Sequence, residues 1–220
     1  MFLYKVNNKK EKLENFKVAI SSTVKSLSNY PKIEVSFGNQ ISRTDQKCIK
    51  LPDLNSINNK INYEEIRAIA DSKSLMVRFS DERILKNYEP EGNVSKKLYK
   101  ISEKIRCEVI GSNYFKGVKN NIEKFYKYRI AELDLKNSED KIVESFENFL
   151  RIKFFDFKNN KEIEKKLKSF TKDISDQFKG KIGELKELAI DQERFNSTIS
   201  QLISEMSLDE NFDDEEKRDQ

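Results

Sequence analysis

The 220-residue sequence is 36% hydrophobic and 36% charged, and its fifteen Phe and eight Tyr supply enough bulky apolar material for a folded domain without disulfides or metal. Its net charge of +4 comes from 42 basic and 38 acidic residues that are mostly interspersed, which is typical of a solvated surface and unlike a phosphate-binding field. The absence of histidine excludes Ser-His-Asp and Cys-His catalysis, HExxH zinc sites and imidazole proton shuttles.

The first predicted elements are a helix and two short strands. Apolar residues recur every three or four positions over residues 11–28, which predicts an amphipathic helix that ends at Tyr30-Pro31. Residues 33–37 alternate apolar and polar side chains, and residues 47–51 form a second strand candidate closed by Pro52. With a Gly38-Asn39 turn after the first strand, the pattern predicts a small two-stranded β-hairpin near residues 33–51.

Helical periodicity returns at residue 63 and continues, with breaks, to residue 206. A loop at residues 90–93 precedes a helix that Ser95 can cap and that Gly111 can end as a C-cap glycine. Further helical stretches cover residues 115–133, 141–157, 162–190 and 195–206, and Gly180 and Gly183 interrupt the third of these. The sequence therefore predicts a mainly α fold.

The sequence after Leu208 reads DENFDDEEKRDQ, which is acidic and almost without apolar residues. This composition cannot bury enough apolar surface to fold and is typical of disorder. We therefore predict one helical domain over residues 1–208, followed over residues 209–220 by the start of a disordered acidic linker.

No residue is predicted to act in catalysis or to hold a cofactor or a metal ion. The sequence contains no GxxxxGK[ST] loop, and the run from Gly180 to Gly183 is too short for one. Carboxylates are plentiful, but no apolar pocket marks one of them as a tuned acid or base. Arg67 and Asp71 are one helical turn apart, which predicts that they can form an ion pair.

The cysteine pattern and the hydropathy bear on the compartment. Cys48 and Cys107 are far apart and form no partner motif, which favours a reducing environment and a role for both as small buried hydrophobes. Few apolar residues precede the first lysine cluster, the reverse of a secretory signal, and no run is long enough to span a membrane. We expect a cytoplasmic protein.

Several short blocks resemble one family in their order and spacing. They are Ile33-Glu34-Val35-Ser36-Phe37, Leu51-Pro52, Arg67 to Asp71 with Ser72, Glu103-Lys104-Ile105-Arg106-Cys107-Glu108-Val109-Ile110-Gly111-Ser112-Asn113, and Gly117-Val118-Lys119-Asn120-Asn121-Ile122. The pattern is similar to the amino-terminal region of CobT, a subunit of the aerobic cobaltochelatase. The resemblance spans about residues 16–216, ends with a closing helix before the acidic run, and is most specific over residues 103–122.

The resemblance implies a component of the ATP-dependent complex that inserts cobalt into the corrin ring in cobalamin biosynthesis. In that family a large CobN-type subunit carries the tetrapyrrole and metal chemistry, a CobS-type AAA+ subunit hydrolyses ATP, and CobT couples them. The implied partners are these two subunits in a ring-shaped oligomer. The complex would then use ATP, Mg and Co. This chain itself is expected to bind no cofactor, no nucleic acid and no membrane.

Two departures limit what the resemblance implies. Family members usually carry histidines near residues 79–85, with a His-Asp pair where Ser80-Asp81 stands here, so no catalytic role is carried over. Members also carry a carboxy-terminal von Willebrand A domain beyond the acidic linker, and we expect that domain to be missing from this chain. Whether it was lost, was truncated from this sequence or lies on another chain stays open.

The specific block leads to a structural hypothesis. We expect Gly111 and Gly117 to form a joint between two packed helices, with Arg106 and Glu108 on the polar face. Glu103, Arg106 and Glu108 would help to form a buried polar network or a subunit contact. Two other functions stay open: a helical adaptor outside the chelatase, and a basic RNA-binding protein, which the excess of lysine over arginine disfavours.

Overall fold

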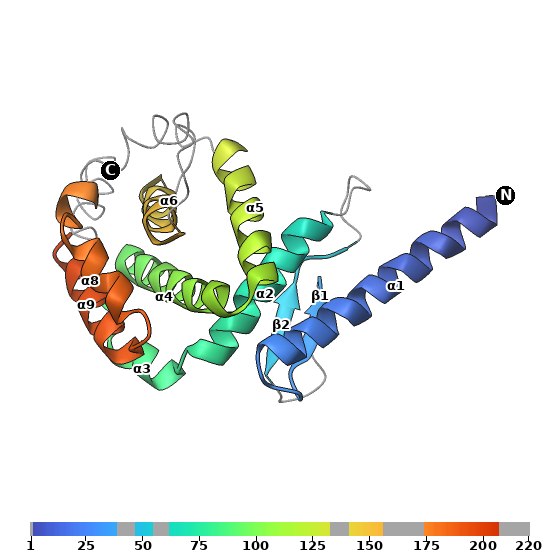
Figure 1. Ribbon diagram of the computed structural model, residues 1–220, viewed down its shortest axis with the longest axis horizontal. Helices are drawn as coiled ribbons and strands as arrows, with labels where there is room; N and C mark the ends of the chain where they lie inside the picture. Colours follow the sequence, from blue (N-terminus) through green and yellow to red (C-terminus); the bar gives the residue numbers. More distant parts are fainter. Residues whose placement is uncertain (1, 39–46, 55–61, 133–140, 156–173, 207–220) are drawn as a thin grey trace, which may run out of the picture.

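The computed structural model describes residues 2–38, 47–54, 62–132, 141–155 and 174–206 (Figure 1). Its mainly helical architecture confirms the prediction from periodicity. The elements, in chain order, are α1 (Phe2–Leu27), β1 (Glu34–Phe37), β2 (Cys48–Leu51), α2 (Tyr63–Phe79), α3 (Glu82–Asn87), α4 (Asn93–Tyr114), α5 (Lys116–Glu132), α6 (Lys141–Phe155), α8 (Lys181–Leu188) and α9 (Gln192–Ser204). The predicted disordered segment over residues 209–220 lies outside the described residues.

The two strands form the expected small sheet, but they pair in parallel. Glu34 lies opposite Cys48, and Phe37 lies opposite Leu51. The hairpin predicted near residues 33–51 is therefore wrong in its strand direction. A hairpin turn produces antiparallel strands, whereas parallel strands require a connection that returns the chain to the first end of the sheet.

The sheet, the carboxy-terminal half of α1 and α2 enclose one apolar cluster. Its buried members are Ile20, Val24, Ile33, Phe37, Ile49, Leu51, Leu54, Ile66 and Ala70. The first turns of α1 extend away from the rest of the described protein (Figure 1). This helix begins at Phe2, well before the predicted start at residue 11.

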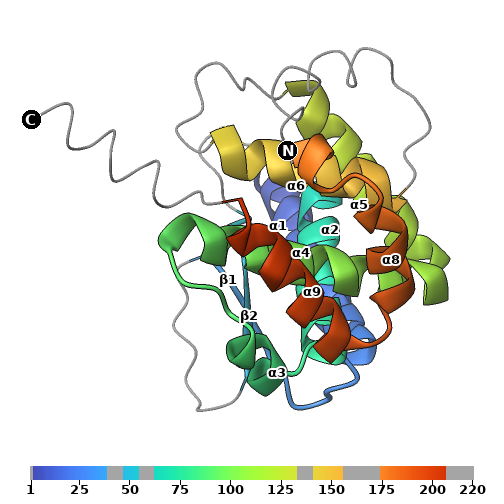
Figure 2. The same ribbon diagram turned by 90° about the vertical axis from the view of Figure 1, so that its left-hand side faces the viewer.

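Helix α4 is the centre of the remaining helices and packs against α2, α5, α6 and α9 (Figures 1 and 2). A second apolar cluster lies between α4, α6, α8 and α9. It is rich in aromatic rings, and Phe178 contacts the rings of Phe146 and Phe149 edge to face, with ring centroids 5.7 and 5.9 Å apart. Such contacts orient α6 against the segment that precedes α8.

Helix boundaries follow local capping signals in some places and depart from them in others. Asn62 caps α2, and Asp81 and Asp191 cap α3 and α9 through their side chains. The predicted Ser95 cap is wrong, because α4 already begins at Asn93, after Gly92. Gly92 has a φ of +86°, a conformation that glycine adopts readily, so the chain can turn into the helix earlier.

The two cysteines differ in their exposure, and neither forms a disulfide. Cys107 is buried as expected, whereas Cys48 is partly exposed beside Ser36 at the edge of the sheet. Within the described ranges, no helix has the length and apolar character needed to cross a bilayer.

Candidate functional site

Helix α4 carries charged side chains into the interior of the protein. Glu103, Arg106 and Glu108 are each at most 1% exposed. Of the two alternatives expected for these residues, the structure therefore shows the buried polar network. A buried charge is unfavourable unless an opposite charge and hydrogen bonds replace its hydration, so the partners of these groups determine their role.

Arg106 pairs with Glu103 and also binds two helix ends. Its Nε and Nη2 atoms donate to the two carboxylate oxygens of Glu103, each at 2.8 Å. Nη2 also donates to the carbonyl of Phe79 at 2.5 Å, and Nη1 donates to that of Ala189 at 2.8 Å. Phe79 ends α2 and Ala189 caps α8, so the cation stabilises carbonyls that helices leave unpaired at their carboxyl ends.

The pKa values of Arg106 and of the neighbouring Cys107 are both raised, so neither group changes its charge near neutral pH. Burial alone would lower the pKa of Arg106, but its hydrogen bonds to Glu103 hold that pKa above the ordinary value. Burial, and then the charge of Glu103, raise the pKa of the neighbouring Cys107 thiol well above its ordinary value. Cys107 therefore stays a thiol and is a poor nucleophile.

Glu108 connects α2, α4 and α6. One carboxylate oxygen accepts a hydrogen bond from Ser72 Oγ at 2.5 Å, and the other pairs with Arg151 Nη1. Arg151 also donates to Glu147 from Nε and Nη2, at 3.0 and 2.8 Å, and its guanidinium carbon lies 3.2 Å from the centroid of the Tyr126 ring. Charge pairs as well as apolar contacts thus fix α6 on α4.

Lys104 completes this charge cluster, with its Nζ 3.6 Å from Glu147 Oε1. Burial would raise the pKa of Glu147, but the charges of Arg151 and Lys104 lower that pKa to about 2. We call Lys104, Glu108, Glu147 and Arg151 the α4–α6 charge cluster. It contains two charges of each sign, so it is balanced at neutral pH.

The predicted contact between Arg67 and Asp71 is not an ion pair in the structure. The guanidinium of Arg67 lies over the Phe16 ring, 5.5 Å from its centroid, while Asp71 is buried and accepts a hydrogen bond from Asn121 Nδ2 at 2.8 Å. Burial raises the pKa of Asp71 to about 6, although the Asn121 hydrogen bond and the charge of Arg67 oppose this shift. Asp71 therefore links α2 to α5.

The two glycines of the specific block have different roles. Gly111 lies inside α4, and a Cβ atom on it would lie 2.3 Å from Leu75 Cδ2, so its small size permits α2 and α4 to cross closely. The prediction that α4 ends at Gly111 is wrong, because the helix continues to Tyr114. Gly117 lies in the first turn of α5, and a Cβ atom there would meet no other atom within 4 Å. The joint between the two helices is at Phe115.

The segment at Ser80-Asp81 joins α2 and α3 and is held by α9. Gln192 accepts a hydrogen bond from the Asp81 amide at 2.8 Å and donates to the Asp81 carbonyl at 3.1 Å and to Ser80 Oγ at 3.3 Å. The Asp81 carboxylate pairs with Arg83. These contacts are structural, because every polar group involved orders a helix end.

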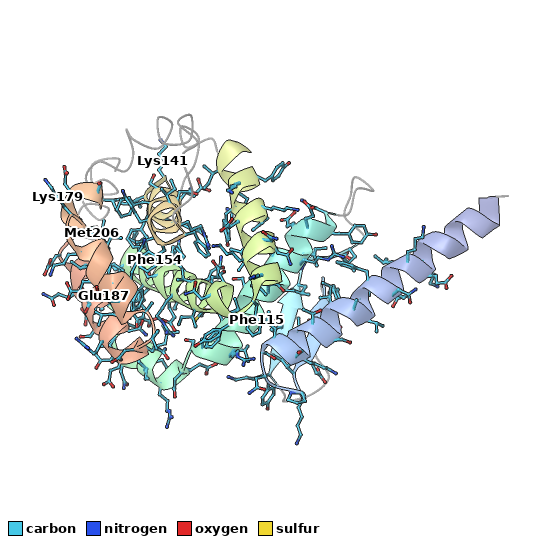
Figure 3. All side chains as sticks on the ribbon, in the orientation of Figure 1. Phe115, Lys141, Phe154, Lys179, Glu187 and Met206 are labelled. Carbon is cyan, nitrogen blue, oxygen red and sulfur yellow. The ribbon has the colours of Figure 1, made fainter. Side chains whose placement is uncertain are left out.

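Aromatic residues form a partly exposed group where α1, α2, α4 and α5 meet. Tyr114 is 71% exposed, and its ring stacks on Phe79 with centroids 6.2 Å apart. The ring of Phe115, which is labelled in Figure 3, lies 6.4 Å from that of Tyr114. The guanidinium carbon of Arg78 is 5.5 Å from the centroids of both Phe79 and Phe115, and its Nη1 donates to the Leu27 carbonyl at 3.2 Å. We call Arg78, Phe79, Tyr114 and Phe115 the aromatic patch.

Several of these residues were not predicted from the sequence. Glu147 and Arg151 are four residues apart in a helical stretch, a spacing that is typical of a pair on one helix face and was the available signal for them. Nothing in the sequence indicated that Glu108 would meet Arg151, because the two lie 43 positions apart. The aromatic patch is likewise assembled from distant parts of the chain, the end of α2 and the end of α4 with the residue that follows it.

The buried carboxylates of α4 and α6 take part in the packing of the helices. The buried carboxylates of Glu103, Glu108 and Glu147 are all paired with arginine, which leaves none of them placed as a general acid or base. Across the described residues, no group of three or more Cys, Asp or Glu side chains is arranged to hold a metal ion.

Comparison with known proteins gives one family. The family model described as cobalamin biosynthesis protein CobT matches residues 10–220 of this chain. No solved structure matches the chain. The match includes every residue of the polar network, of the close helix crossing and of the aromatic patch.

Proposed function

Since the chain belongs to the CobT family of cobalamin biosynthesis proteins, we propose that it is a non-catalytic subunit of the cobaltochelatase complex. In this proposal a CobS-type AAA+ subunit binds ATP and Mg, and a large CobN-type subunit binds the corrin ring. Cobalt is the substrate that the complex inserts. The chain itself holds the two other subunits in a productive arrangement, in the cytoplasm.

The proposal rests on the family match. The contacts made by the most specific block of the resemblance, residues 103–122, support a role in assembly. Arg106 and Glu108 make contacts between helices, Glu103 pairs with Arg106 within α4, and Gly111 permits the close crossing of α2 and α4. Residues used in this way give a protein a fixed shape. A fixed shape suits a subunit that binds its partners with a pre-organised surface.

A binding experiment tests the assignment. The purified full chain should retain the AAA+ subunit or the large chelatase subunit from the same organism on an affinity resin. Cells that lack the chain should lose cobalt insertion and regain it when the chain is restored. Failure to bind either partner, with no effect on cobalt insertion, would leave a helical adaptor outside the chelatase as the better assignment.

Two further results would contradict the proposal directly. The first is ATP hydrolysis or cobalt insertion by the purified chain alone, since the chain is proposed to lack a reaction centre. The second is RNA binding that weakens steeply with salt, because such a slope reports counterion release from phosphate contacts and not protein assembly.

A further inference from the structure

The aromatic patch has the composition of a protein-docking surface. Exposed Tyr and partly buried Phe side chains around an arginine are typical of the residues that dominate binding energy at interfaces. Tyr114 is 71% exposed although it lies at the end of a well-packed helix. Ile190 lies close by, because Arg106 binds the adjacent carbonyl of Ala189 together with that of Phe79, and it is 85% exposed.

The charges around the patch are positive. Arg78 is exposed, as are Lys25 in the last turn of α1 and Lys116 at the start of α5. The carboxylates at the start of α3 are engaged, since Asp81 pairs with Arg83 and Glu82 lies 3.6 Å from Lys47. The carboxylate of Asp191, which follows Ile190, caps α9. An acidic segment with an aromatic residue would match this surface in both charge and shape.

The chain carries such a segment in its own sequence. Residues 209–216 read DENFDDEE, which places a single aromatic residue, Phe212, among six carboxylates. The ring of Phe212 can pack against Tyr114 and Phe79, while the flanking carboxylates face Arg78 and the two lysines. No other stretch of the sequence combines an aromatic residue with so dense a run of acidic residues.

The same chain is poorly placed to supply this segment to its own patch. Helix α9 begins beside the end of α2, where Gln192 binds Asp81, and its 13 residues carry the chain about 20 Å away. Figure 3 shows Met206 at the left edge of the view, beside α8 and α9, and Phe115 near its centre. The six residues from Met206 to Phe212 span at most about 20 Å when fully extended, so a return within one molecule would leave no slack.

We infer that the aromatic patch binds residues 209–216 of a second copy of this chain. The contact is heterologous, because a patch on one copy meets a segment on the next, and such contacts propagate into rings or filaments. The inference does not rest on the proposed chelatase role, since it concerns the purified chain alone. It predicts that the chain associates with itself, and that higher salt weakens the association.

The first test is the oligomeric state of the full chain by sedimentation velocity. Tyr114→Ala and Phe212→Ala should each weaken self-association by about tenfold or more, as the loss of an aromatic anchor does at other interfaces. Tyr128→Ala is the matched control, because Tyr128 is also an exposed tyrosine, 54% exposed, but lies on α5 away from the patch. Thermal melting should show that all three variants fold like the parent.

The second test separates exchange between copies from a contact within one chain. The Tyr114→Ala chain keeps an intact acidic segment, and the Phe212→Ala chain keeps an intact patch. Each alone should be monomeric, whereas an equimolar mixture should form a dimer and stop there, because only one functional contact can form. A synthetic peptide of residues 207–220 should dissociate the parent oligomer.

Three results would overturn the inference. They are a parent chain that stays monomeric at low salt, a variant mixture that does not associate, and a Tyr128→Ala chain that loses association as much as Tyr114→Ala does. If Tyr114→Ala also lowers the melting temperature, the inference stays testable. Phe212→Ala changes the other side of the contact and must show the same loss of self-association.

Discussion

The two ends of this protein are stabilised by different kinds of interaction. Around the sheet, α1 and α2 enclose a cluster of aliphatic and aromatic side chains such as Ile33, Ile49 and Leu54. Around α4, the packing also includes the Glu103–Arg106 pair and the α4–α6 charge cluster. The apolar end gains stability in proportion to the area it buries, about 25 cal/mol per Å².

The charged end gains less net stability from its ion pairs, because their attraction mainly offsets the lost hydration. What it gains is a single arrangement, since an arginine with fixed donors accepts few alternative positions of its partners. We therefore expect substitutions at the two ends to differ in size and in pH dependence. The following changes test that difference, from the largest expected effect to the smallest.

Arg106→Met should be the most damaging single change. It leaves Glu103 buried without a counter-charge and removes the donor for the Phe79 and Ala189 carbonyls, so we expect a loss of about 3–5 kcal/mol in the free energy of unfolding. Urea denaturation at neutral pH measures it. The double variant Glu103→Leu/Arg106→Met should recover much of the loss, and equal losses in both variants would show that the ion pair is not the cause.

Asp71 should make stability fall as the pH rises through the range between about pH 4 and 6. Its pKa in the folded protein is raised by burial to about 6, from an ordinary 3.8, so the folded state binds a proton that the unfolded chain releases. The stability it contributes is therefore complete below pH 4 and lost above pH 6, by at most about 3 kcal/mol. Asp71→Asn should remove this slope and be the more stable protein at pH 7.

Glu147 titrates in the opposite direction and makes the comparison sharper. Its folded-state pKa is lowered to about 2 despite its burial, chiefly by Arg151, so its contribution is present above its ordinary pKa and is lost as the pH falls toward 2. Urea denaturation from pH 3 to 7.5 resolves the two windows, since only the slope above pH 4 should vanish in Asp71→Asn. An unchanged slope in that variant would contradict the assignment to Asp71.

Gly111→Ala should cost about 1–3 kcal/mol, because the added methyl group would overlap Leu75 at the crossing of α2 and α4. Gly117→Ala is the matched control in the next helix, where the methyl group meets no neighbour, and it should be neutral or stabilising by up to about 1 kcal/mol. Thermal melting of both variants checks this. Similar melting temperatures for the two would mean that the crossing is looser than the structure indicates.

Ile49→Val, at the apolar end, should cost only about 0.5–1.5 kcal/mol. Ile105→Val on α4 removes the same methyl group from an equally buried site and should cost a similar amount. Urea denaturation of the pair therefore isolates the role of charge. A much larger loss at Ile105 would show that the two ends differ in packing as well as in ion pairs.

Local patterns predicted the helices well, because the periodicity of Leu98, Ile101 and Ile105 depends only on neighbours along one helix. They failed where distant segments decide the outcome. Glycine is a good helix stop, yet Gly111 continues α4, since Leu75 packs in the space that its missing side chain leaves. The parallel direction of β2 relative to β1 was likewise missed, because a local turn signal does not specify how two separate segments pair.

The candidate site was predicted in its residues but not in its surroundings. Glu103, Arg106 and Glu108 were singled out, and a buried network was one of the alternatives considered for them. Their charge indicated a polar face, and the positions of Arg151 and the Ala189 carbonyl explain why that face is inside. A single sequence does not reveal partners that lie 43 or 83 positions away.

The two cysteines differ in their exposure, so the reaction of the buried one with a thiol reagent can report local opening of the fold. Cys48 sits partly exposed on β2, so a thiol reagent will reach it while the fold is intact. Cys107 lies on α4, is buried by the neighbouring helices and is a protonated thiol, so a reagent reaches it only when those helices separate. In a Cys48→Ser chain, the labelling rate of Cys107 would measure how often these helices separate. A slower rate in the presence of a partner would show that binding of the partner suppresses the separation.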